Sequence, residues 1–97
     1  MNEEKFYENQ ALLVLLNIRT EEDLSSPDTA ELHYLDPDGG TGTWTGSTIT
    51  NLRVLNHQIP KNILAIAGTW KLTGFVEKGT VSVFTETVEI FVREKFG

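Results

Sequence analysis

The chain has 97 residues, a length that fits one domain with its own core. It contains no cysteine, which excludes disulfides and thiolate metal sites. Fourteen acidic residues against eight basic ones give a formal net charge of −6 without a Lys/Arg cluster, so we expect no nucleic-acid partner and no anionic membrane.

The N-terminal part of the chain contains its longest apolar run. Residues 1–10 are polar except for Phe6 and Tyr7, and they predict an N-terminal arm or a short first strand, with a short helix as the alternative. Residues 11–19 are apolar on both parities, which predicts a strand buried on both faces or covered by a partner chain. The apolar run at 11–16 is too short to span a bilayer, and acidic residues precede it. We therefore expect a soluble protein made in the cytoplasm, without membrane insertion.

The middle of the chain reads as strands separated by loops. Residues 20–28 predict a loop, and residues 29–35 predict a strand with alternating inward and outward side chains. The sequence DPDGG at 36–40 is the strongest turn signal of the chain. A threonine-rich strand is predicted at 41–50, with bulges or an edge position at its glycines. Another strand is predicted at 52–59 and ends at a proline.

The last third contains the strand with the clearest alternation. Residues 61–67 predict a crossover or one helical turn. Residues 67–77 predict a strand with Trp70 as its largest inward side chain. In the following run the inward positions change from odd to even numbers, which predicts a bulge or a change of sheet between Phe84 and Thr87.

About seven short strands without a convincing long helix describe an all-β domain. We predict a single immunoglobulin-like antiparallel β-sandwich over residues 11–97, preceded by the arm at 1–10.

Candidate chemical sites in the sequence are weak. His33 and His57 lack a third zinc ligand at a suitable spacing, and we expect them at ordinary strand and loop positions. Asp36 and Asp38 resemble the start of a calcium loop, but no glutamate follows at the required position, so a hairpin turn is the preferred interpretation. The glycines at 39–42 lack the ending of a phosphate-binding loop. We expect a non-enzymatic protein without a metal, a cofactor or a small-molecule substrate.

The strand-and-turn patterns of the chain fall into three groups. They are DLSS at 23–26; YLDPDG at 34–39 with GTWTG at 42–46; and AGTWKL at 67–72 with FVE at 75–77 and ETVE at 86–89. In this order they resemble a family of small bacteriophage structural proteins, which is similar to the N-terminal immunoglobulin-like domain of phage baseplate upper proteins. The resemblance runs from about Lys5 to Phe96 and departs at 59–66, where IPKNILAI stands in place of an acidic turn. It implies a virion component.

The expected function is therefore structural. We expect a minor capsid, decoration or spike-base protein of the virion that binds other virion proteins in a homo- or hetero-oligomeric assembly. A baseplate or tail-fibre anchor is the second choice within this class. Two hypotheses from different classes are a host-encoded adhesin-like or periplasmic sandwich and a receptor- or carbohydrate-binding module with Trp44 as its platform. Trp44, Phe91 and Phe96 are predicted on faces opposite the core parity, as core residues of the second sheet or as interface anchors. Phe75 lies on the outward parity of its strand and is the fourth candidate interface residue.

Overall fold

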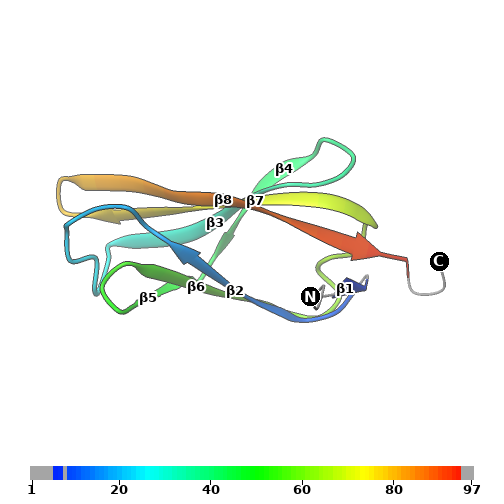
Figure 1. The fold of residues 1–97 in the computed structure, drawn as a ribbon, viewed down its shortest axis with the longest axis horizontal. Helices are drawn as coiled ribbons and strands as arrows, with labels where there is room; N and C mark the ends of the chain where they lie inside the picture. The colour runs from blue at the N-terminus through cyan, green and yellow to red at the C-terminus, as the bar shows by residue number, and fades with distance from the viewer. Residues whose placement is uncertain (1–5, 8, 95–97) are drawn as a thin grey trace.

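The computed structural model describes residues 6, 7 and 9–94, which form two β-sheets packed face to face (Figure 1). The strands are β1 (Phe6–Tyr7), β2 (Leu12–Asn17), β3 (Thr29–Leu35), β4 (Thr41–Thr45), β5 (Thr48–Thr50), β6 (Val54–Ile59), β7 (Gly68–Lys78) and β8 (Val81–Arg93). The larger sheet has the order β1-β8-β7-β3-β4, and the smaller sheet has the order β2-β6-β5. The described residues contain no helix long and apolar enough to cross a membrane.

This strand order confirms the predicted β-sandwich of immunoglobulin-like type. If β2 to β8 are lettered B, C, C′, D, E, F and G, the two sheets are BED and GFCC′, as in that fold. All pairings are antiparallel except that of β1, which runs parallel to β8. The arm at 1–10 therefore contributes a two-residue strand, while its residues 1–5 and 8 lie outside the described part of the chain.

The turn after β3 is built as the sequence predicts. Oδ1 of Asp36 accepts hydrogen bonds from the backbone N–H groups of Asp38 (2.9 Å) and Gly40 (2.8 Å). Gly39 has a φ of 87°, a conformation that glycine adopts without a Cβ penalty. The Asp36 carboxylate thus stabilises the turn that connects β3 to β4.

The predicted single strand at 41–50 was wrong, because the chain changes sheets in its middle. β4 ends at Thr45 on the edge of the larger sheet, and β5 begins at Thr48 on the edge of the smaller one. Gly46 lies between them with a φ of 89°, which provides the sharp change of direction. The predicted edge position is confirmed, whereas the glycine marks a switch rather than a bulge.

Two loop residues close the ends of the core, and the sequence patterns did not identify them. Leu24 lies in the loop between β2 and β3, and Leu64 lies in the connection between β6 and β7; both are fully buried. The N–H of Leu24 donates to the carbonyl of Leu52 (2.9 Å), and the carbonyl of Leu64 accepts from the N–H of Asn9 (2.8 Å). These bonds satisfy backbone groups that burial would otherwise leave without partners. The connection at 61–67 is a crossover without a helical turn.

The centre of the core lies on β7, as predicted. Trp70 is 3% exposed, and Leu72 and Val76 are fully buried on the same face. The indole N–H of Trp70 donates to the carbonyl of Ile66 (2.8 Å), just before the strand begins. A tyrosine hydroxyl makes a comparable bond at the start of strand F in immunoglobulin domains. Trp70 therefore fills the core and fixes the entry of the chain into β7.

A β-bulge confirms the predicted change of parity in β8. Thr73 pairs with Thr87 and Phe75 pairs with Phe84, so two residues of β8 oppose the single Gly74. One of the two, Thr85, is buried, and its Oγ1 accepts a hydrogen bond from the N–H of Gly74 (2.7 Å). The hydroxyl thereby replaces a bond that the bulge removes from the ladder.

The prediction that the strand at 11–19 is buried on both faces by its own chain was wrong. Val14 and Leu16 point into the core, whereas Leu13 and Leu15 are 54% and 56% exposed. The strand belongs to a sandwich of two layers, so one of its faces necessarily lies outside. Its four leucines and one valine give no polar alternation that would have revealed this.

Candidate interaction surfaces

An aromatic patch lies on the outer face of the larger sheet, and we define it as His33, Phe75 and Phe84. The ring of Phe84 lies 5.1 Å from that of Phe75 and 6.1 Å from that of His33, measured between centroids. Three neighbouring strands contribute one ring each, because β3, β7 and β8 are adjacent. Phe84 is 62% exposed although it lies within a strand. His33 and Phe75 are partly buried beneath it. Aromatic side chains that lie exposed on a partly buried cluster are enriched at surfaces that bind other proteins.

Acidic side chains adjoin the aromatic patch. Glu31 pairs in register with Phe75, and Oε1 of Glu31 lies 2.9 Å from Nε2 of His33. Glu77 follows two positions after Phe75 on the same face of β7. The aromatic patch therefore has acidic side chains at its border.

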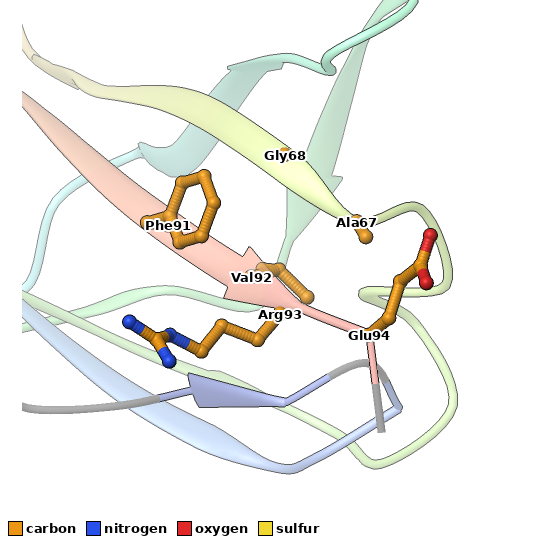
Figure 2. A pocket seen from close by; sticks show the side chains of 6 residues that line it. All are labelled: Ala67, Gly68, Phe91, Val92, Arg93 and Glu94. Atoms are coloured by element: carbon orange, nitrogen blue, oxygen red, sulfur yellow. The ribbon is translucent and has the colours of Figure 1, made fainter. Parts of the chain in front are cut away.

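A second apolar site lies at the end of β8, at the opposite end of the same face. Phe91 is 57% exposed and borders a hollow of about 420 Å³. Figure 2 shows the lining residues, which come from the end of β8 with Glu94 after it and from the start of β7 with Ala67 before it. The Thr73–Thr87 and Lys71–Glu89 pairs lie between Phe91 and the aromatic patch. The strand rise per residue puts the two sites roughly 20 Å apart. The two apolar sites are therefore separate regions of one face.

Trp44 does not belong to this outer face, which corrects its predicted position opposite the core parity. Its indole packs against the core, stacks on Tyr34 at 4.4 Å and lies 6.0 Å from the ring of His57 in the other sheet. Trp44 is partly buried at the margin of the core, and the rest of its surface lines a hollow beside Pro60 and Ile63. The side chain proposed as a carbohydrate platform therefore packs on the core with one part of its surface and is accessible with the other. Phe96, the remaining candidate, lies outside the described residues.

The two histidines have structural surroundings of different kinds. His57 is buried within the sandwich, and its Nδ1 lies 2.7 Å from Oγ of Ser47. Burial lowers the pKa of His57 below its ordinary value, because the charged form loses hydration. His33 lies on the outer face as part of the aromatic patch. Within residues 6, 7 and 9–94, no three acidic or histidine side chains come together in a group that could hold a metal ion.

The acidic loop at 20–28 is held by hydrogen bonds to the neighbouring hairpin. Hydrogen bonds from Ser25, to which Lys78 and Arg53 add a coulombic contribution, lower the pKa of Asp23. Nζ of Lys78 donates to the carbonyl oxygens of Ser25 (2.5 Å) and Asp23 (3.2 Å). Oδ2 of Asp28 accepts from the N–H of Gly79 (2.8 Å). The carboxylates of Asp23 and Asp28 thus stabilise the conformation of this loop.

The predicted and observed surface residues overlap in part. The structure places Phe75 and Phe91 on one outer face, as their parity predicted. Phe84, Leu13 and Leu15 were not identified as surface candidates, although together with Phe91 they are the most exposed large apolar side chains among the residues that the structure describes. The sequence did contain a signal for the exposure of Phe84. The change of parity at the bulge places its side chain on the outer face, opposite Phe75.

Compared with known proteins, the chain matches no family model, no curated protein and no solved structure.

Proposed function

We propose that this chain is a non-enzymatic structural protein that acts by binding other proteins through the outer face of its larger sheet. The observation that carries the proposal is Phe84, which packs on Phe75 yet leaves 62% of its surface in water. Aromatic side chains in such positions supply much of the binding energy where a partner covers them. The aromatic patch is the primary contact, and the site at Phe91 is the second.

The polar side chains of the chain support a structural function. The carboxylate of Asp36 holds a turn, the carboxylate of Asp28 holds the acidic loop, and His57 bonds to a serine inside the sandwich. These groups stabilise the framework that presents the outer face. The acidic border of the patch favours a partner whose apolar contact is surrounded by basic groups.

The resemblance of the sequence patterns supports a bacteriophage particle as the setting. The proposed position is that of a minor capsid, decoration or spike-base protein, with a baseplate or tail-fibre anchor as the second choice. The partners would be other virion proteins, and the protein would be made in the host cytoplasm before assembly.

The test compares the amount of chain in purified particles for the wild type, Phe84→Ser and Ser82→Ala. Ser82 is an exposed neighbour on the same face of β8 and provides the matched control. Loss of a binding residue worth about 2 kcal/mol lowers affinity about 30-fold, so Phe84→Ser should be strongly depleted and Ser82→Ala retained. Both free variants should unfold at nearly the wild-type urea concentration. Absence of the wild type from particles, or equal incorporation of all three chains, would refute the proposal.

A further inference from the structure

One edge of the smaller sheet has no partner within the described part of the chain. β2 pairs with β6 on one side, and no described strand pairs with its other side. The N–H of Ile18 donates to the carbonyl of Arg53 (2.9 Å), which extends the ladder and fixes its phase. Even-numbered residues of β2 therefore bond to β6, and the N–H and C=O groups of Leu13, Leu15 and Asn17 point toward the open edge.

This edge lacks the features that protect the other edges. β1 has two residues, β5 has three, and β4 contains Gly42 and turns away at Gly46. β2 has six residues of sequence LLVLLN, without a charge, a proline or a bulge. Edge strands that remain solvent-exposed usually contain such features because a bare apolar edge adds another strand.

We propose that β2 of a second copy occupies this edge, antiparallel to the first about a twofold axis, with Leu15 opposite Leu15 of the second copy. In this register Leu13 of each copy lies opposite Asn17 of the other. The three residues of β2 whose N–H and C=O groups point toward the open edge then all form bonded pairs, which gives about six backbone hydrogen bonds. The two smaller sheets become one continuous sheet of six strands. The inference rests on the proposed function, since it names one of the protein contacts through which the chain assembles.

The charge of the chain is compatible with this contact. Two copies with a net charge of −6 repel one another, so their contact is favoured where neither copy has charges. Residues 9–18 contain no Asp, Glu, Lys or Arg. Arg19, the next residue, lies opposite Ala11 of the second copy in the proposed register. The exposed side chains of Leu13 and Leu15 then form an apolar stripe that crosses the twofold axis on the outer face of the joined sheet.

Single cysteines test the register, because the chain has no cysteine of its own. In the bonded pair the Cα atoms at position 15 lie roughly 5.5 Å apart, within the range of a disulfide. Leu15→Cys should therefore form a covalent dimer under mild oxidation. Leu13→Cys, an equally exposed control, should remain largely monomeric, because its two sulfur atoms are separated by about four residues along the strands. Equal cross-linking of both variants, or of neither, would overturn the proposed pairing.

Sedimentation equilibrium tests the dimer without a cross-link. The wild type and Leu15→Val should be dimeric at micromolar concentration. Leu15→Pro removes an N–H that β6 does not use and should weaken dimerisation at least tenfold, while circular dichroism reports whether it folds. If that variant fails to fold, Leu13→Lys, which places a charge on the edge, should show the same weakening. A monomeric wild type would overturn the inference, whereas the proposed function would stand if this monomer still entered particles through Phe84.

Discussion

Replacement of Trp70 by alanine tests the core that the sequence and the structure both assign to this side chain. The residue is 3% exposed at the centre of the sandwich. Truncation of a buried tryptophan costs about 3–5 kcal/mol. The lost hydrogen bond to the carbonyl of Ile66 adds about 1 kcal/mol. Since domains of this size are stable by about 5–15 kcal/mol, Trp70→Ala should lose a large part of the free energy of unfolding at 25 °C.

The assay is urea unfolding followed by far-ultraviolet circular dichroism, which does not depend on the removed fluorophore. Lys71→Ala is the matched control, because Lys71 is the next residue in β7 and points outward to an exposed contact with Glu89 at 3.9 Å. This variant should change the free energy of unfolding by less than about 0.5 kcal/mol. A loss under about 1 kcal/mol for Trp70→Ala would refute the assignment of this residue to the core.

Two further predictions concern the bulge and the buried histidine. Thr85→Val keeps the shape of the side chain but leaves the N–H of Gly74 without its acceptor, so it should lower the urea-derived stability by about 1–3 kcal/mol, whereas Thr85→Ser should retain most of it. Because the pKa of His57 is lowered in the folded chain, the unfolded chain takes up this proton first as the pH falls. Stability should therefore decrease below about pH 6.5, and less so in His57→Gln; equal pH dependence of the two chains would contradict this.

The sequence was sufficient for the parts of the fold that depend on local alternation and turn chemistry. The residues at 29–35 alternate cleanly and form β3 with those bounds. The parity change between Phe84 and Thr87 located the bulge, because a shift of one residue moves every later side chain to the other face. In each case the evidence lay within a few residues of the feature.

Other features depended on contacts between distant segments and could not be predicted from neighbouring residues in the sequence. The sequence around Gly46 fits both a bulge within one strand and a turn that takes the chain into the other sheet, as observed with its φ of 89°. Leu24 is a single apolar residue in a polar loop, and its burial depends on the distant strands that surround it. The run at 11–16 is apolar at every position, so the sequence does not distinguish the inner face from the exposed one.

The candidate surfaces also combine features that the local sequence predicts with features that depend on distant segments. Parity placed Phe75 and Phe91 on the outward positions of their strands. It did not show that three strands bring Phe75, Phe84 and His33 together, since this depends on sheet order and register. Trp44 packs against the core because β4 pairs with β3, where Trp44 lies opposite the fully buried Leu32.

Hydroxyl-radical footprinting of the free chain and of purified particles tests the central claim most directly. The side chain of Phe84 is 62% exposed in the free chain and should be labelled readily. If a partner protein covers the aromatic patch, the labelling of Phe84 should fall several-fold in particles, while that of exposed residues away from any contact stays the same. A chain that is present in particles with Phe84 labelled as strongly as in solution would contradict the account.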